Sequence, residues 1–318
     1  MRRSCLMLMF ILVGVRGYSW GFYGHRLINF QAVFLLPPEM IAFYKPNIEF
    51  ISSHAVDPDK RRYAVSEEGP RHYIDIDRYR GTIIPRSWSK AVEKFTEDTL
   101  KSHGIVPWWI QVMQARLTKA FRENNVHAIL KLSAETGHYL GDAHVPLHTS
   151  SNHNGQFTNQ QGIHGFWESR IPEIFAETEW DLFNDRALYI RNPLEFIWKR
   201  VEESAKASDS VLKFERILNN RFTPDRKYAF ENRNGKIIRQ YSNEYSRAYN
   251  EMLDGMVERR LRQSVFAVAS FWYTAWVNAG QPDLKKLNRK ELSEVEQIEF
   301  NALEMKWKNE KIKGWSCD

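Results

Sequence analysis

Segments with helical patterning that end at proline or glycine cover most of this chain, and this pattern constrains the fold more than any other feature. Residues 25–36 are expected to form a helix that stops at Pro37 and Pro38, and residues 38–44 a short second one. Further helices are expected over residues 87–102, 107–124, 126–143 and 242–279. Residues 57–86 contain the breakers DPDKRR, EEGP and IIPR, which predict an irregular segment.

The sequence shows no internal repeat and no convincing pair of strands. It therefore predicts an all-α fold, with a single multi-helix domain over residues 20–283 and long ordered loops. Aromatic residues make up 14% of the chain, enough to wedge such helices together around a core. Residues 284–318 read as a charged helical tail, expected to be a solvated face rather than a functional element.

The first nineteen residues have the features of a secretory signal peptide. Two arginines precede an apolar run over residues 6–15, and the Gly-Tyr-Ser at 17–19 is a small-x-small cleavage pattern. The apolar run is too short to span a bilayer; a buried helix is the alternative interpretation. We expect cleavage after Ser19, a mature chain that begins at Trp20, and a secreted or periplasmic location.

Net charge and cysteine content bear on the possible partners of the chain and on whether disulfides stabilise it. Removing residues 1–19 takes away three arginines and no acid, so the net charge falls from +6 to +3. A charge this small does not argue for a nucleic-acid or membrane partner. The two cysteines are Cys5, which would leave with the signal peptide, and Cys317. The exported chain would have no internal disulfide, so its fold must be stabilised by other interactions.

Three histidines and an aspartate lie within eleven residues of the segment ETGHYLGDAHVPLHTSS, residues 135–151. His138 and Asp142 are four residues apart, so a helix would place both side chains on one face. Pro146 cannot continue that helix, and His148 can then turn back toward the same place. This arrangement indicates that these side chains bind one common group.

A second pair, His164 and Glu168, repeats the four-residue spacing in GIHGFWESR. Imidazole nitrogen and carboxylate oxygen are ligands that zinc takes at about 2.0–2.2 Å. Helices that point such pairs inward can build a metal site in a bundle. One such pair alone is more often a surface contact, but two pairs separated by a short loop favour the metal site.

Two loop segments and the mature amino terminus add candidate ligands. HAVDPDKRRY contains Asp57 and Asp59, and EGPRHYIDID contains His72; alone, these are ordinary loop residues. The mature start WGFYGHR places His25 five residues after Trp20. A deprotonated amine at Trp20 is a metal ligand, and the carbonyl of the same residue can close a chelate ring.

With these residues the chain resembles the zinc-dependent phospholipase C and S1/P1 nuclease superfamily, whose mature proteins begin with Trp and bind three zinc ions in an all-α fold. The resemblance covers residues 20 to about 172 and rests on the order and approximate spacing of nine residues: Trp20, His25, Asp57, His72, His138, Asp142, His148, His164 and Glu168. It implies three zinc sites: Asp57, His72, His138 and Asp142; Trp20, His25 and the shared Asp142; and His148, His164 and Glu168. Asp57 is preferred to Asp59 because its fifteen-residue separation from His72 suits the family, and Asp59 remains the alternative.

Several neighbouring residues fall outside this ligand set. His54, His144 and His153 have no place in the ligand pattern. The basic run Lys60, Arg61 and Arg62 is either a phosphate clamp or, as is more common, a solvated charge run. Asp75, Asp77 and Glu135 are candidates to accept the free ring N–H of ligand histidines.

The resemblance implies hydrolysis of a phosphodiester by zinc-activated water, with Asp57 doubling as a general base. A phospholipase C activity, with peripheral membrane contact, is preferred because Glu168 stands where the nucleases use Asp. The loop between His148 and His164 is also short, and the disulfides of the nucleases are missing. No stable protein partner is expected.

Two alternatives remain open. An S1/P1-type single-strand nuclease would need aromatic side chains to stack a base, and Phe157, Phe166 and Trp167 are candidates. A zinc-binding protein without turnover would use its metals only for structure. The zinc-binding protein without turnover is disfavoured by the set of His148, His164 and Glu168, because three protein ligands leave one zinc position open.

Overall fold

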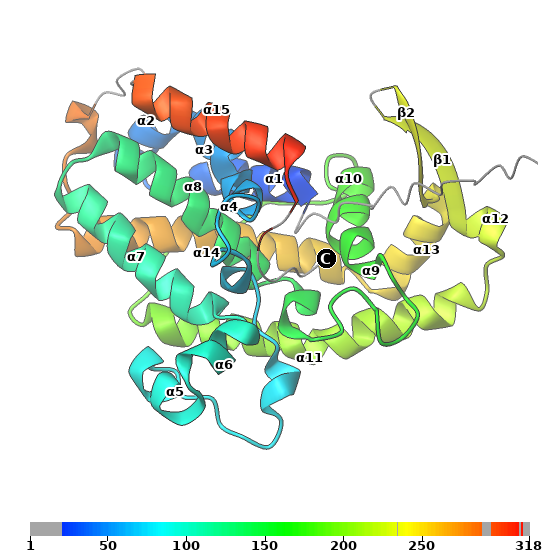
Figure 1. The fold of residues 1–318 in the computed structure, drawn as a ribbon. Coiled ribbons are helices and arrows are strands. Elements are labelled where there is room, and N and C mark those ends of the chain that lie inside the picture. Colours follow the sequence, from blue (N-terminus) through cyan, green and yellow to red (C-terminus); the bar gives the residue numbers. More distant parts are fainter. Residues whose placement is uncertain (1–20, 234, 288–293, 312, 314–318) are drawn as a thin grey trace, which may run out of the picture.

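The computed structural model describes residues 21–233, 235–287, 294–311 and 313, and it confirms the all-α prediction (Figure 1). The central helix, α8 (Val126–Asp142), packs against α1 (Gly21–Val33), α7 (Val106–Arg122) and α14 (Met256–Asn278). The longest helix, α11 (Pro193–Asn219), runs below this group in Figure 1 and contacts α7.

Shorter elements surround this group of helices. They are α2 (Pro38–Tyr44), α3 (Ile48–Ser53), α4 (Asp57–Arg61), α5 (Trp88–Phe95), α6 (Glu97–Ser102), α9 (Ile163–Gly165), α10 (Ile171–Phe175), α12 (Pro224–Lys227), α13 (Asn243–Met252), α15 (Glu294–Asn309), and the strands β1 (Tyr228–Arg233) and β2 (Lys236–Tyr241). Among the described helices, none combines the length and apolar character that crossing a membrane requires. The expected signal peptide, Trp20 and both cysteines lie outside the described residues.

Helix α8 is buried without a break over residues 133–142, because other helices enclose it. Two glycines let α1 cross it closely. A Cβ on Gly137 would lie 1.9 Å from Oδ1 of Asn29, and one on Gly141 would lie 3.2 Å from Nδ1 of His25. Nδ2 of Asn29 also donates a hydrogen bond to the carbonyl of Ala134 on α8, 3.0 Å away. The small residues of α8 therefore bring His25 against the helix that carries His138 and Asp142.

Two of the expected helices are each divided in two. Residues 87–102 form α5 and α6, which meet at Thr96 with φ of 68°. Residues 242–279 form α13 and α14, separated at Asp254 and Gly255, whose φ values are 50° and 67°. A left-handed residue ends the regular helix, and glycine adopts that conformation without a steric penalty.

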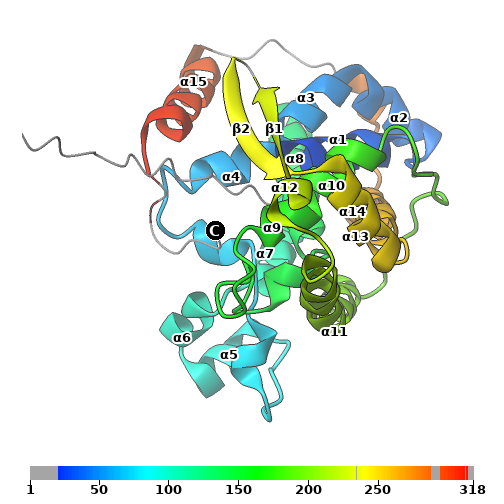
Figure 2. The same cartoon turned by 90° about the vertical axis from the view of Figure 1, so that its right-hand side faces the viewer.

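The expectation that no strands pair is wrong. β1 and β2 form an antiparallel hairpin that pairs Tyr228 with Tyr241 and Arg233 with Lys236 (Figure 2). The sequence did carry a signal, because an Asn-Gly dipeptide at 234–235 is typical of a two-residue hairpin turn. The hairpin joins the helices through Tyr241, whose ring stacks on Phe166 with centroids 3.8 Å apart.

Candidate metal centre

His138 and Asp142 lie side by side on α8, as their spacing predicts. Nε2 of His138 is 3.2 Å from Oδ2 of Asp142, and neither side chain is exposed. His72, which follows the 3-10 turn η3 (Gly69–Arg71), reaches the same place. Its Nδ1 is 3.0 Å from Oδ2 of Asp142 and 3.0 Å from Nε2 of His138. The fold thus joins a loop residue to the expected helical pair.

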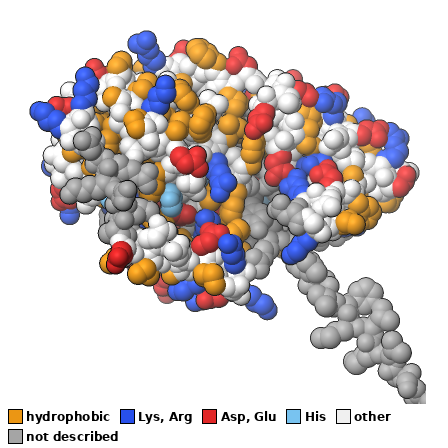
Figure 3. Space-filling view, turned by 90° about the horizontal axis from the view of Figure 1, so that it is seen from above, with side chains coloured by type: hydrophobic (Ala, Val, Ile, Leu, Met, Phe, Trp, Pro, Cys, Tyr) orange, Lys and Arg blue, Asp and Glu red, His pale blue; other side chains and the backbone are white. Residues whose placement is uncertain are grey.

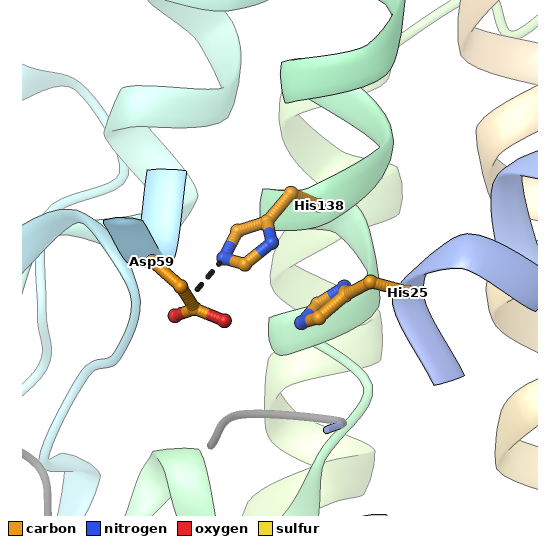
Figure 4. Close-up of side chains that lie close together, drawn as sticks. All are labelled: His25, Asp59 and His138. Atoms are coloured by element: carbon orange, nitrogen blue, oxygen red, sulfur yellow. Dashed lines mark ion pairs between the residues drawn. The ribbon is translucent and has the colours of Figure 1, made fainter. Parts of the chain in front are cut away.

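A second carboxylate faces these histidines from α4. Oδ1 of Asp59 lies 3.7 Å from Nδ1 of His72 and 3.7 Å from Nε2 of His138. Figure 4 shows Asp59 pointing from α4 toward His138 on α8. Ligand atoms held about 2.0–2.2 Å from a tetrahedral zinc ion are separated by roughly 3.4 Å. Asp59, His72, His138 and Asp142 are here called the four-ligand cluster. The separations given above, 3.0–3.7 Å, fit one such ion.

Asp57, which the sequence analysis preferred as the ligand, has other partners. Its Oδ2 lies 2.6 Å from Nδ1 of His54, and its Oδ1 lies 3.6 Å from Nζ of Lys60. Asp57 and Asp59 both belong to α4, where residues two apart are turned by about 200° around the helix axis. Only one of them can face α8. The geometry therefore favours Asp59, the alternative left open by the sequence, as the carboxylate of α4 that faces the histidines.

His25 on α1 extends the four-ligand cluster. Its ring stacks on that of His138 with centroids 3.8 Å apart (Figure 4). Its Nε2 lies 3.4 Å from Oδ1 of Asp142. Oδ2 of Asp142 faces His72 and His138, whereas Oδ1 faces His25, so this carboxylate can serve two ions. Trp20, the expected partner of His25, lies outside the described residues.

His148, His164 and Glu168 meet in a second group, here called the three-ligand cluster. Nε2 of His148 and of His164 lie 3.4 Å and 3.1 Å from Oε2 of Glu168. His148 belongs to the 3-10 turn η5 (Pro146–Thr149), and Glu168 to the π-helical turn η6 (Phe166–Arg170). All three side chains are buried. The proline stop and the four-residue spacing therefore lead to the expected meeting.

Many of these buried ligand atoms have no hydrogen-bond partner among the described residues. They are both oxygens of Asp59 and of Glu168, Oδ1 of Asp142, and Nε2 of His25, His148 and His164. An unpaired buried polar group costs on the order of 1–3 kcal/mol, and native folds hold few of them. Bound cations would supply the missing partners, and imidazole nitrogen with carboxylate oxygen is a donor set of zinc.

Backbone carbonyls orient two of the ligand histidines. Nδ1 of His138 donates to the carbonyl of Ala55 at 2.9 Å, and Nδ1 of His148 donates to the carbonyl of His72 at 2.7 Å. Each bond leaves Nε2 to face its cluster. The ring of His72 is reversed, because Oε1 of Glu68 lies 3.6 Å from its Nε2 and Nδ1 faces the cluster.

The carboxylates expected to orient these rings make other contacts. Asp77 accepts hydrogen bonds from N and Oγ of Ser151, at 3.0 Å and 2.6 Å. Glu135 lies 2.6 Å from a guanidinium nitrogen of Arg61. Asp75 is partly buried near Asp77, and desolvation and that charge raise its pKa to about 7. Backbone carbonyls take the expected role for His138 and His148, and a backbone acceptor leaves no mark in the sequence.

The charges of both clusters favour bound cations. Burial alone would lower the pKa of His148, but the carboxylates of Asp142 and Glu168 outweigh it and raise the pKa to about 9. Burial alone would raise the pKa of Asp142, yet His138 and His148 hold that pKa well below its usual value. The carboxylate of Asp142 therefore stays ionised, and its negative charge is balanced by protonated histidines or by metal ions.

The three histidines without a place in the ligand pattern, His54, His144 and His153, lie outside both clusters. His54 pairs with Asp57, and buried His144 donates from Nδ1 to the carbonyl of Leu140 at 2.7 Å. The ring of His153 has its centroid 6.1 Å from that of His164. These positions agree with the absence of all three residues from the ligand pattern.

The basic run after Asp59 is divided between different environments. Lys60 pairs with Asp57 and, at 2.8 Å, with Glu304. Arg61 pairs with Glu135. Arg62 is buried, and its Nη1 lies 3.9 Å from Oδ1 of Asp59. Arg62 is therefore the residue of this run that lies beside a candidate ligand.

Residues 20–271 match the family model described as S1/P1 Nuclease. A search of curated proteins found no significant match. The matched region contains His25 and every residue of both clusters, and it covers well over half of the chain. The family consists of zinc-dependent phosphodiester hydrolases, in agreement with the donor set of the buried clusters. The chain therefore belongs to the S1/P1 nuclease family of the phospholipase C/P1 nuclease superfamily.

Proposed function

We propose that this chain is an exported three-zinc enzyme that hydrolyses phosphodiester bonds in single-stranded nucleic acid. The proposal rests on the two buried clusters, which lie within a region that matches a nuclease family. Their atoms are spaced as zinc ligands, and many of these atoms have no hydrogen-bond partner among the described residues. Export is supported by the signal-peptide features of residues 1–19.

The proposed ions are divided among the candidate ligands as follows. The four-ligand cluster holds one ion, and the three-ligand cluster holds another. His25, Oδ1 of Asp142 and the amine and carbonyl of Trp20 hold the third. Structural zinc is saturated by protein ligands, whereas three protein ligands leave a position for water or substrate. The three-ligand cluster therefore favours an enzyme over a zinc-binding protein without turnover.

The side chains around the ions have separate tasks. When bound, the zinc ions lower the pKa of water toward about 7 and neutralise charge on the phosphate oxygens. Asp142 is held between His138 and His25, so that its two oxygens face different ligands. A carboxylate oxygen of Asp59, which has no hydrogen-bond partner among the described residues, accepts the proton of the attacking water. Arg62 adds positive charge beside Asp59 for the anionic substrate.

The nucleic-acid substrate is supported by one exposed aromatic side chain in the loop that joins two residues of the three-ligand cluster. Phe157, in the loop between His148 and His164, is 66% exposed and can stack on a base. Phe166 and Trp167, the other candidates for stacking, are buried in the core and are not available. Stacking of a base on the ring of Phe157 suits a substrate that is bound with little sequence preference.

A phospholipid head group is the second candidate substrate. It is favoured by Glu168 in the position where the resembled nucleases use Asp, and by the short loop between His148 and His164. Both substrates present the same anionic diester to the metal centre. The choice between them depends on the surroundings of the clusters rather than on the ligands.

Zinc analysis with paired substrate assays tests the proposal. Protein that begins at Trp20 is expected to bind three zinc ions and to cleave single-stranded DNA. Phe157→Ala is expected to raise KM for DNA by about tenfold, since stacking on one base is worth about 1–3 kcal/mol. Hydrolysis of phosphatidylcholine without hydrolysis of DNA would contradict the nuclease proposal and favour a phospholipase C activity. A protein that binds zinc without cleaving either substrate would contradict both.

Extending the chain before Trp20 should remove one zinc ion and most of the activity. An extension converts the terminal amine into an amide, which is a poor metal ligand. The measurement is zinc content and kcat for a form whose extension ends in a protease site before Trp20. Cleavage of that site is the matched control and is expected to restore both values. Full zinc content and normal turnover in the extended form would exclude the amine as a ligand.

A further inference from the structure

The C-terminal helix α15 (Glu294–Asn309) follows the region that matches the nuclease family, yet it packs onto the segments that carry candidate ligands. It lies beside α4 in both ribbon views (Figures 1 and 2). Its partly buried residues Phe300, Glu304 and Trp307 recur at helical spacing and form one face. Its other face is turned to solvent, on the side of the molecule seen in Figure 3, where hydrophobic and charged side chains are interspersed.

The inner face of α15 holds α4 from the side opposite to the metal ligands. Oε2 of Glu304 lies 2.8 Å from Nζ of Lys60, the residue after Asp59. The ring of Phe300 packs on His54, with centroids 4.3 Å apart, and His54 in turn pairs with Asp57. Lys60 and Asp57 belong to one side of α4, whereas Asp59 faces His138 from the other.

Two further contacts reach the ends of the same site. The ring centroid of Trp307 lies 5.1 Å from that of Phe22 on α1, three residues before His25. Nζ of Lys60 lies 5.7 Å from the ring centroid of Trp307. Beyond the helix, the backbone N–H of Lys313 donates to the carbonyl of Arg62 at 2.8 Å. Helix α15 therefore contacts the start of α1 and Lys60 on α4, and Lys313 beyond it contacts Arg62, the residue after α4.

The size of α4 explains why such support is needed. A helix of five residues is too short to be stable alone, and the carboxylates of Asp57 and Asp59 are both buried. Its position must come from tertiary contacts on both sides. Bound cations would hold the side of Asp59, and α15 holds the other side.

We propose that α15 is a strap that positions Asp59 and His25 for metal binding, with Glu304 and Trp307 as its positioning residues. This inference rests on the proposed function, because it assumes that the four-ligand cluster binds zinc. The three-ligand cluster is formed by η5, α9 and η6, whereas the ring and ion-pair contacts of α15 given above reach α1, His54 and α4. The strap therefore acts on one part of the metal centre and spares the other.

The test compares zinc affinity in Trp307→Ala, in Glu304→Ala and in Met305→Ala as the matched control. Met305 lies on the same helix but is 58% exposed. Loss of a supporting residue typically weakens metal affinity by about 10–100-fold. We expect this loss in Trp307→Ala and Glu304→Ala for the ions at His25 and Asp59, with the third ion kept at wild-type affinity. Met305→Ala and the conservative Trp307→Phe should keep all three ions.

The outcomes separate the strap from the function on which it rests. Adding Glu168→Gln to Trp307→Ala should remove the ion that remains, which assigns it to the three-ligand cluster. Wild-type zinc affinity at every site in Trp307→Ala and Glu304→Ala would overturn the strap. An equal loss at all sites with a lower melting temperature would also overturn it, because α15 would then only stabilise the fold. Absence of zinc binding by the unaltered protein would instead refute the proposed function.

Discussion

Glu168→Gln is expected to lower kcat for phosphodiester hydrolysis by at least about 10³-fold while helix content stays unchanged. Both oxygens of Glu168 are buried, and Oε2 lies within 3.4 Å of two histidine nitrogens. The amide of glutamine is uncharged and turns a donor toward the cluster, so the charge that offsets the cation is lost. A catalytic ion contributes several kcal/mol to the transition state, and each 1.36 kcal/mol is a factor of ten.

Steady-state kinetics, zinc content and far-ultraviolet circular dichroism measure the effect of Glu168→Gln. His148→Ala should lose activity in the same way, because it removes another ligand of the same cluster. Glu173→Gln is the matched control, since Glu173 lies on the next helical segment, is exposed and pairs with Arg233 at 2.6 Å. Wild-type turnover in Glu168→Gln or His148→Ala would count decisively against a catalytic three-ligand cluster.

Asp59→Asn is expected to lower kcat by about 10²–10⁴-fold, whereas Asp57→Asn should change it by less than about tenfold. Asp59 faces His72 and His138 and has no hydrogen-bond partner among the described residues. Asp57 instead contacts His54 and Lys60 on the far side of the same short helix. The two variants make the same chemical change two residues apart, so each is the control for the other.

Zinc titration of the two variants supplies a second readout. Asp59→Asn should bind the ion of the four-ligand cluster more weakly, while Asp57→Asn should match the unaltered protein. The reverse pattern, with zinc and activity lost only in Asp57→Asn, would restore the ligand preferred from the sequence. It would also mean that α4 turns its other side toward α8 when metal is bound.

Local patterns predicted most of the helices in the first half of the chain and two pairs of candidate ligands. Proline stops ended helices near Leu36 and Asp142, and four-residue spacing placed His138 beside Asp142. These features depend on neighbours within a few residues, so the sequence alone reveals them. The breaks at Thr96 and Gly255 were missed, because a single left-handed residue barely disturbs an apolar pattern.

The hairpin was missed for a different reason. Its Asn-Gly turn was readable, but the flanking strands show little alternation of apolar and polar residues. Phe230 and Ile237 remain exposed, and the hairpin is attached through Tyr241 and the contact of Arg170 with Glu231. A strand pair that buries few of its own side chains gives a weak periodic signal.

The sequence by itself determined the class of the fold, the residue types of the candidate metal centre and their order along the chain. Only the tertiary structure decided which aspartate of α4 faces the histidines, which backbone carbonyls orient His138 and His148, and that α15 packs on α4. The physical reason is the range of the interactions. Helix formation is set by residues three or four positions apart, whereas the face that a short helix turns inward is set by packing against residues far away in the chain.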